Sequence, residues 1–213
     1  MSDNEFIEKF ITSEKIEENR FSCLKTALND ARKLTGRNLE SGNYELKIFE
    51  NNDTTFDPHS FIGIINYLLI LDMIGEIFTT RNKINKIYKA LKEFSSLTDR
   101  DIDTVVSLRN SLAHNYGLIN IPDNQNKNST QRHKFIISTS LSILIEYPLS
   151  TNKWNGDYAD KSESSSTKIG YIELCNLVEA VYADLISKLE NNLIVISLNG
   201  GIEELKSRFT IRH

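Results

Sequence analysis

The chain is poor in residues that interrupt helices or crosslink a fold. Its 213 residues include 9 Gly, 3 Pro and 2 Cys. So few glycines and prolines favour long, uninterrupted helices over a turn-rich β-sandwich. Cys23 and Cys175 have no CxxC spacing, which excludes a disulfide framework and fits a reducing cytosol with both thiols buried as small hydrophobic groups. The N-terminal stretch lacks the basic start and apolar core of a signal peptide, so we expect a cytoplasmic protein.

A strong basic charge and a membrane span are missing as well. The net charge is −4, whereas a protein that coats nucleic acid usually carries a basic surplus. A nuclease that binds RNA locally and briefly stays compatible with this balance. The longest apolar stretch, 61–77, is interrupted by Asn66, Asp72, Gly75 and Glu76. A spanning helix needs ~20 mostly apolar residues, so we expect a buried helix here and no membrane association.

Common metal and phosphate motifs are also absent. The four histidines are His59, His114, His133 and His213, and none has a second histidine or cysteine at ligand spacing. The chain has no GxxxxGK[ST], GxGxxG or GxSxG sequence. We therefore expect no metal site and no cofactor.

Apolar residues at helical spacing dominate the chain. They predict helices over about 6–35, 58–79, 82–94, 102–114, 168–191 and 202–209, the first with a possible break. Ser2 with Glu5 fits a capping box, and Thr98 starts a similar signal before the fourth helix. Asp57 caps the second helix, which Pro58 opens. Glycines at 36 and 117 are placed to end the first and fourth helices.

Short β-like runs are inserted among these helices. They cover 44–49, 135–137, 143–147 and 193–198. We expect 135–137 and 143–147 to pair, and 119–134 and the serine-rich stretch 154–167 to be loops, the latter exposed or disordered and anchored by Trp154 and Tyr158. An Asn-Gly-Gly turn at 199–201 precedes the last helix.

The predicted fold is mainly α. We expect a four- to five-helix up-and-down bundle with a small inserted β-hairpin or sheet near the C-terminal part. A single domain, 1–213, contains the core bundle at 58–117 and 168–191, the loop and hairpin insertion at 119–167, and a strand with a short helix at 193–213.

The candidate catalytic residues lie at the end of the fourth predicted helix. In an ideal helix each residue turns ~100°, which places Asn110 and His114 as i and i+4 neighbours on one face. Leu108 and Leu112 form an apolar stripe almost opposite, so His114 does not point with the core leucines. Arg109 lies ~140° from His114. Both reach one reacting group only if the helix distorts before His114 or a second chain brings its own copy.

These side chains suit cleavage of RNA without a metal. The ribose 2′-hydroxyl must lose a proton and the leaving 5′-oxygen must gain one, and a histidine does either near neutral pH. Arg109 can offset the extra negative charge of the phosphorane in bidentate fashion. Asn110 can orient the His114 imidazole or donate to a phosphate oxygen.

This stretch resembles the HEPN superfamily, whose hallmark is an arginine, a polar residue, and a histidine after four to six intervening residues. Arg109, Asn110 and His114 match the four-residue form. The resemblance implies a helical bundle that forms a homodimer around the motif. Many members are metal-independent ribonucleases of toxin–antitoxin, abortive-infection and other defence systems, and others keep the fold without activity. The resemblance is clearest over about 58–117. The β-like insertion and the C-terminal tail lie outside the minimal bundle.

The resemblance gives Tyr116 a possible role. In HEPN toxins with a His-x-Tyr ending, a nucleotidyltransferase-like antitoxin adenylylates the tyrosine, so Tyr116 is a candidate target. Otherwise its ring packs at the helix end and its hydroxyl bonds near the cleft. The third predicted helix carries a basic run that either tracks RNA phosphates or is a solvated face. This run comprises Arg81, Lys83, Lys86, Lys89 and Lys92.

Two alternatives to a nuclease stay open for the motif. Arg208 and His213 repeat the same spacing, and we treat this second match as accidental because it lies near the C-terminal end. The chain could be a HEPN module that binds a partner without catalysis, which the acidic net charge favours. It could also be a plain helical scaffold, in which Arg109 forms an ion pair and the helix dipole favours His114 at the helix end.

Overall fold

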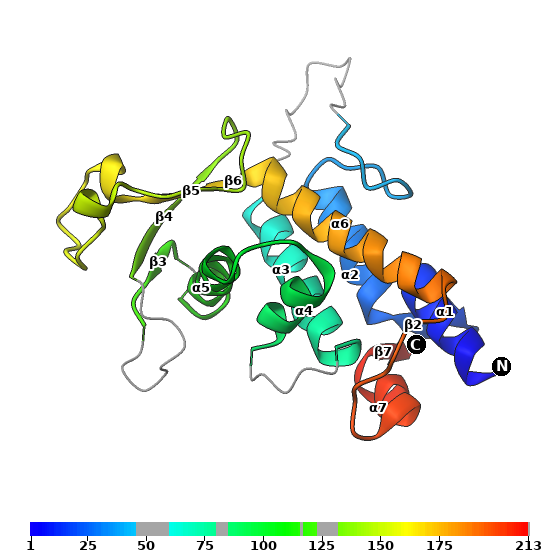
Figure 1. Cartoon of the computed structure of the whole chain (residues 1–213). Coiled ribbons are helices and arrows are strands. Elements are labelled where there is room, and N and C mark those ends of the chain that lie inside the picture. Colours follow the sequence, from blue (N-terminus) through cyan, green and yellow to red (C-terminus); the bar gives the residue numbers. More distant parts are fainter. Residues whose placement is uncertain (46–59, 80–84, 116, 123–131, 213) are drawn as a thin grey trace, which may run out of the picture. The chain divides into compact units, whose positions relative to one another are not determined.

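The computed structural model describes residues 1–45, 60–79, 85–115, 117–122 and 132–212. The chain is mainly helical with small sheets, as predicted (Figure 1). It divides into two compact units, Met1–Ser95 with Val178–His213, and Ser96–Leu177. The single predicted domain is thus divided, and the division passes through both predicted core segments, 58–117 and 168–191.

The first unit contains most of the helices. They are α1 (Asp3–Thr12), α2 (Cys23–Leu34), α3 (Phe61–Ile77), α4 (Lys86–Phe94), α7 (Gly201–Arg208) and the C-terminal part of α6 (Tyr171–Glu190). A three-stranded antiparallel sheet of β1 (Lys15–Glu17), β2 (Arg20–Ser22) and β7 (Thr210–Arg212), in that order, completes it. The sequence patterns gave no sign of these three-residue strands.

The predicted first helix is in fact two helices with a β-hairpin between them. Ser2 caps α1 by accepting from the main-chain N–H of Glu5 at 3.2 Å, as the capping box predicts. Ser22 makes the break: its buried hydroxyl donates to Phe10 O at 2.6 Å and accepts from Lys25 N at 3.1 Å, which caps α2. Gly36, with φ +67°, follows the end of α2, as expected for a residue that can adopt the left-handed conformation.

Helix α3 lies between α2 and α4, and its glycines allow the close packing (Figure 1). A Cβ at Gly75 would collide with the main-chain oxygen of Lys86, and one at Gly63 would collide with Thr35. The predicted start of this helix at Asp57-Pro58 is wrong, because Ser60 caps it by accepting from Gly63 N at 3.1 Å. Residues 57 and 58 themselves lie outside the described residues.

Two other helix starts also differ from the prediction. Asn85 caps α4 by accepting from Tyr88 N at 3.0 Å, so α4 begins at Lys86 rather than near position 82. Residues 168–170 belong to a strand, so α6 begins at Tyr171. The predicted strand at 44–49 lies mostly outside the described residues, and Tyr44 forms an isolated bridge with Arg37.

A buried ion pair crosslinks the first unit. Arg32, only 3% exposed, donates from Nε and Nη2 to the two carboxylate oxygens of Glu179 at 2.9 and 2.7 Å. Tyr67 O–H donates to the same carboxylate at 2.6 Å, and Arg32 Nη1 donates to the main-chain oxygen of Leu39 at 2.5 Å. Gly42, with φ +71°, lies against this carboxylate, where a Cβ would collide with it. This cluster joins α2, α3, α6 and the segment after α2.

The second unit contains α5 (Asp99–Asn115) and a four-stranded sheet. Its strands are β3 (Ile119–Asn120), β4 (His133–Ser138), β6 (Thr167–Gly170) and β5 (Ile145–Glu146), in that order. The predicted hairpin between 135–137 and 143–147 is wrong, because β6 lies between those two runs. Strand β4 pairs in parallel with β6, with Phe135 opposite Thr167, and β5 pairs antiparallel with it, with Ile145 opposite Ile169.

The serine-rich stretch 154–167 is ordered by local hydrogen bonds. Trp154 is buried and donates from Nε1 to Asp157 O at 2.8 Å, and the ring of Tyr158 meets it edge-on at 5.9 Å. These two residues therefore anchor the stretch, as predicted. Short 3-10 turns lie at Ser150–Asn152 and Glu163–Ser165, and position 167 already belongs to β6.

The predicted strand at 193–198 is wrong as a paired strand. The segment connects α6 to α7 without belonging to a sheet, and Ser197 N donates to Ile77 O at 2.8 Å. The turn at Asn199-Gly200 and the last helix follow as expected. In the described ranges, no helix has the length and hydropathy needed to cross a bilayer.

Candidate functional site

Helix α5 carries the motif predicted to be functional. Thr98 starts it: its Oγ1 accepts from Asp101 N at 3.2 Å and donates to the Asp101 carboxylate at 2.6 Å. The helix continues without a break to Asn115, and Gly117 N donates to Ser111 O at 3.2 Å beyond its end. Both ends agree with the sequence prediction. Residues 109–114 therefore share one continuous helical backbone.

The buried side of α5 is wider than its apolar stripe. Ile102, Val105, Leu108 and Leu112 are fully buried, as the helical spacing predicts. Small hydroxyl residues are buried beside them, namely Thr104, Ser107 and Ser111. Two of these hydroxyls donate within the helix: Thr104 Oγ1 to Arg100 O and Ser111 Oγ to Ser107 O, both at 2.9 Å. The apolar stripe and the neighbouring row of hydroxyl residues are both buried, which fixes the rotation of α5 about its axis.

Arg109 and Asn110 contact one another near the C-terminal end of the helix. Both side chains are half-buried, and Arg109 Nη1 donates to Asn110 Oδ1 at 3.3 Å. The amide oxygen is then turned toward the guanidinium, which leaves the amide N–H groups as the donors of Asn110. Guanidinium and amide N–H groups are donors of the kind that bind an anion.

His114 lies on the same helix one turn after Asn110. Its backbone is part of α5, and its side chain lies outside the described residues, as does Tyr116. The i and i+4 spacing places the two backbone positions on one face of α5. The structure thus brings Arg109 and Asn110 into contact and keeps His114 at the predicted helical phase.

The predicted basic run is only partly described. Arg81 and Lys83 lie outside the described residues, while Lys86, Lys89 and Lys92 lie on α4 in the other unit. Lys86 pairs with Glu76 at 3.4 Å, so part of its charge is offset. This ion pair weakens the interpretation of the run as a surface that tracks phosphates.

Arg208, the arginine of the second Arg–His match, is held by ion pairs in the structure. Arg208 forms an ion pair with Glu204 on its own helix and with Glu76 at 3.2 Å. These two carboxylates occupy its guanidinium, and His213 lies outside the described residues.

Sequence reasoning missed a polar cluster at the other end of α5. The hydroxyl of Tyr147 donates to Asp101 Oδ1 at 2.8 Å and lies 3.0 Å from Thr104 Oγ1, while the Arg100 guanidinium lies 3.6 Å from its ring centroid. Burial raises the pKa of Tyr147 to about 12. The phenol stays protonated and acts as a structural donor that joins the residue after β5 to α5. Only the aromatic end of the run 143–147 hinted at this contact.

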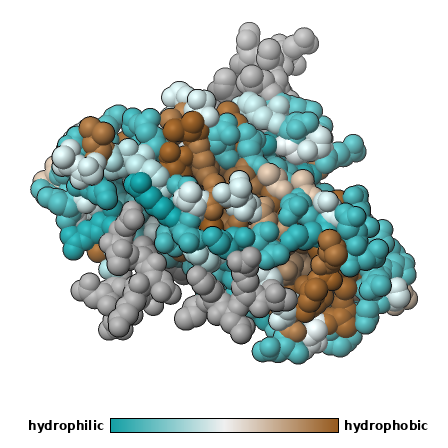
Figure 2. Space-filling model, in the orientation of Figure 1, coloured by the Kyte–Doolittle hydropathy of each residue, from teal (hydrophilic) through white to brown (hydrophobic). Residues whose placement is uncertain are grey.

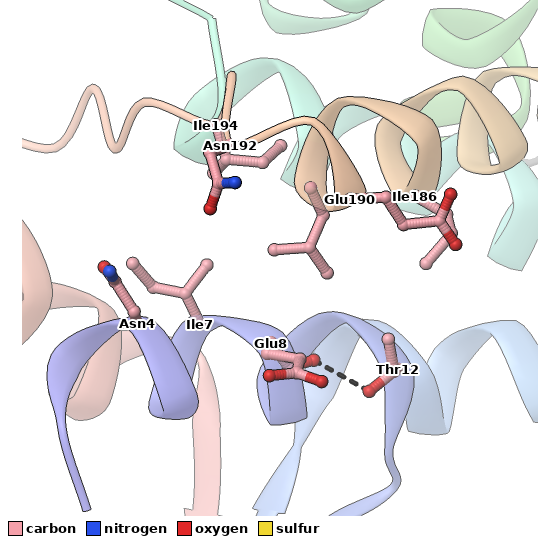
Figure 3. A pocket seen from close by; sticks show the side chains of 9 residues that line it. Asn4, Ile7, Glu8, Thr12, Ile186, Glu190, Asn192 and Ile194 are labelled. Atoms are coloured by element: carbon pink, nitrogen blue, oxygen red, sulfur yellow. Dashed lines mark hydrogen bonds between the residues drawn. The ribbon is translucent and has the colours of Figure 1, made fainter.

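The described residues show no metal site, and the groove that they form lies away from the motif. Among the side chains that the structure describes, no three of His, Cys, Asp or Glu gather where a metal ion could be held. A groove of about 410 Å³ lies in the first unit between α1 and the end of α6, and its lining includes no motif residue (Figure 3).

No protein-family model, curated protein or solved structure matches this chain. The resemblance to the HEPN superfamily therefore rests on Arg109, Asn110 and His114 and on the capped helix that carries them.

The buried histidine of the second unit offers a pH test of the fold. His133 is 4% exposed, lies 3.0 Å from Thr167 Oγ1 through Nδ1 and stacks on Phe135. Burial, reinforced by the positive charges of Arg100 and Lys153, lowers its pKa from 6.5 to about 4. The folded state thus favours the neutral imidazole, and the unfolded state takes up the proton first as the pH falls.

The free energy of unfolding should therefore be highest above pH ~6.5 and fall between pH 6.5 and about 4. At 1.36 kcal/mol per pKa unit, the loss from this group approaches about 3 kcal/mol. Denaturant unfolding of wild type and His133→Gln across this window measures it, because carboxylates titrate alike in both proteins. Parallel pH curves for the two proteins would contradict the prediction.

Proposed function

We propose that the protein is a metal-independent RNA endonuclease of the HEPN type that acts as a homodimer. The observation that carries the proposal is the contact between Arg109 and Asn110 on a capped, continuous helix, with His114 one turn further along it. The resemblance adds a setting: a toxin or another effector of defence, with a nucleotidyltransferase-like antitoxin as a possible partner acting on Tyr116.

The reaction needs a base and an acid. A histidine removes the proton from the ribose 2′-hydroxyl, and the 2′-oxygen attacks the adjacent phosphorus. The bond from phosphorus to the 5′-oxygen then breaks, and that oxygen takes a proton from a second histidine. The products are a 2′,3′-cyclic phosphate and a 5′-hydroxyl, and no electrons are gained or lost. Two copies of His114, one from each subunit, fill both roles.

Arg109 and Asn110 stabilise the charge of the transition state. The phosphorane carries an additional negative charge on its oxygens, and a guanidinium donates to two of them at once. The ~140° between the helical positions of Arg109 and His114 favours a site shared between subunits, in which each histidine meets the arginine of its partner.

The test is cleavage of single-stranded RNA in the presence of a chelator. We expect the wild-type protein to cut it and to leave a 2′,3′-cyclic phosphate, and to leave uncut a substrate with 2′-deoxyribose at the cleavage position. Arg212→Ala, which removes an exposed arginine of the other unit, serves as a matched control and should cut normally. Cleavage of the 2′-deoxy position, or activity that appears only with added metal, would refute the proposal.

A second candidate is a HEPN module that binds a partner without catalysis. The net charge of −4 and the ion pair that offsets Lys86 favour it, because both weaken attraction to RNA. It predicts that wild type and His114→Ala are equally inert toward RNA and retain the same partner in a pull-down from the native host.

A further inference from the structure

The segment 193–197 between α6 and α7 has the composition of a strand and pairs with no strand among the residues that the structure describes. Its sequence, Leu-Ile-Val-Ile-Ser, is dense in β-branched residues, which favour extended backbone. Figure 1 draws it as an open stretch of chain that leads from the end of α6 to α7. It belongs to neither sheet of the described residues.

Main-chain hydrogen bonds hold the two ends of this segment. Leu193 N donates to Lys188 O and Ser197 N donates to Ile77 O, both at 2.8 Å. In the part of the chain that the structure describes, no main-chain bond holds the three residues between them. Main-chain groups of an extended chain point alternately to its two edges. Ser197 N bonds toward the protein at Ile77 O, so in an extended chain residues 194 and 196 present their N–H and C=O groups at the opposite edge.

The side chains of the segment are unusually exposed for apolar residues. Leu193 is 65% exposed and Val195 is 54% exposed, while Ile194 and Ile196 are half-buried. Figure 2 shows a hydrophobic area at the lower right, where Figure 1 draws this connection. Proteins usually protect such an edge with lysine, proline or a covering element, because it pairs readily with another strand. The segment 193–197 contains neither residue.

We propose that this edge pairs with the same edge of a second copy of the chain, antiparallel and about a two-fold axis through Val195. Ile194 then lies opposite Ile196 of the second copy, and each such pair exchanges both main-chain hydrogen bonds. Val195 faces its own counterpart at a position without main-chain bonds. If the opposite edge of the segment paired instead, the interchain hydrogen bonds would need the N–H groups of residues 193 and 197, which already donate within the chain.

Charge and symmetry favour a second copy over a foreign strand. In this register only apolar residues and a serine face one another at positions 193–197. No charged residue lies within the paired segment, so no like charges meet across it. An isologous pair uses one surface twice, which is the commonest way in which soluble proteins form dimers. A strand with charged residues would lose this match.

The groove beside the segment gains an apolar neighbour from the second copy. Figure 3 shows side chains of α1 and of the end of α6 facing one another across it, with Ile194 at one end. Its apolar lining is formed by Ile7, Ile186, Leu189 and Ile194. Directly opposed residues project to the same face of a sheet, so the partner's copy of Ile196 lies beside Ile194 and extends this apolar lining. Glu8 and Glu190 remain on its rim.

The dimer proposal is independent of ribonuclease activity. The segment and the motif belong to different units, and the tests below measure mass and crosslinking rather than cleavage. If the edge pairs but the protein does not cut RNA, or if the protein cuts RNA but the edge does not pair, these tests and the cleavage assay will distinguish the two results.

A cysteine at the axis tests the register. Antiparallel residues without main-chain bonds have Cα atoms ~4.5 Å apart, within the range that a disulfide spans. We expect Val195→Cys to form a crosslinked dimer under mild oxidation. Leu149→Cys, at a residue 73% exposed in the other unit, is the matched control and should stay uncrosslinked, as should wild type with Cys23 and Cys175. Equal crosslinking of both variants would overturn the register.

Opposite charges at the same position test the pairing itself. Val195→Lys and Val195→Glu should each sediment as a smaller assembly than the wild type, because like charges face one another across the axis. Mixing the two variants should restore the wild-type mass. The exposure of Val195 makes both substitutions compatible with folding, which circular dichroism checks. A wild-type protein that is monomeric at every concentration, or a Val195→Lys protein that keeps the wild-type mass, would overturn the proposal.

Discussion

Replacement of His114 by alanine is expected to lower the rate of RNA cleavage by about 10²- to 10⁴-fold, the range over which general acid–base groups act. The substitution removes the group that we propose moves both protons, and it leaves the backbone of α5 unchanged. Single-turnover cleavage with excess protein measures the chemical step. Thermal unfolding of the same samples separates loss of chemistry from loss of fold.

Variants of Arg109 give a comparison for the His114→Ala result. Arg109→Ala should reduce cleavage by a similar factor, whereas Arg109→Lys keeps the charge, loses the bidentate geometry and should retain part of the rate. If two histidines act as base and acid, the wild-type pH–rate profile is bell-shaped, and each limb belongs to one protonation state. His114→Ala with wild-type cleavage would end the enzymatic proposal.

The sequence could predict the parts of the fold that depend on neighbours along the chain. Ser2 and Thr98 cap helices because the side chain and the N–H that it accepts from are three residues apart. The end of α5 was predicted for the same reason, since Gly117 follows a run of helical residues. The positions of Arg109 and Asn110 then followed from helix geometry alone.

Pairing between distant strands could not be predicted in the same way. Phe135 pairs with Thr167 across an intervening stretch of 31 residues, and that stretch contains a run with a higher β-propensity than the true partner. Short strands gain their stability from such partners rather than from their own sequence. The segment 193–197 shows the converse, because its composition predicts a strand although the described part of the chain supplies no partner strand for it.

The contact between Arg32 and Glu179 was hidden for a related reason. The two residues are 147 positions apart, and each lies on a helix where a charged side chain usually faces water. Only the packing of α2, α3 and α6 brings them together inside the first unit. Nothing local marks either residue as buried.

Replacement of Glu179 by alanine is expected to destabilise the first unit by about 3–5 kcal/mol. The substitution leaves the 3% exposed guanidinium of Arg32 without its carboxylate and leaves the Tyr67 hydroxyl without its acceptor. Denaturant unfolding measures the loss. Glu146→Ala is the control, because it breaks a solvent-exposed pair with Lys168 and should change stability little.

A double substitution shows what this ion pair contributes. Much of the loss in Glu179→Ala comes from the charge that stays buried, so removing both charges should cost less than the single change. We expect Arg32→Met combined with Glu179→Leu to be more stable than Glu179→Ala alone. Because Arg32 also donates to Leu39 O, the double variant still loses the contact that holds the segment after α2. A double variant less stable than Glu179→Ala would mean that this main-chain contact, rather than charge compensation, dominates the cluster.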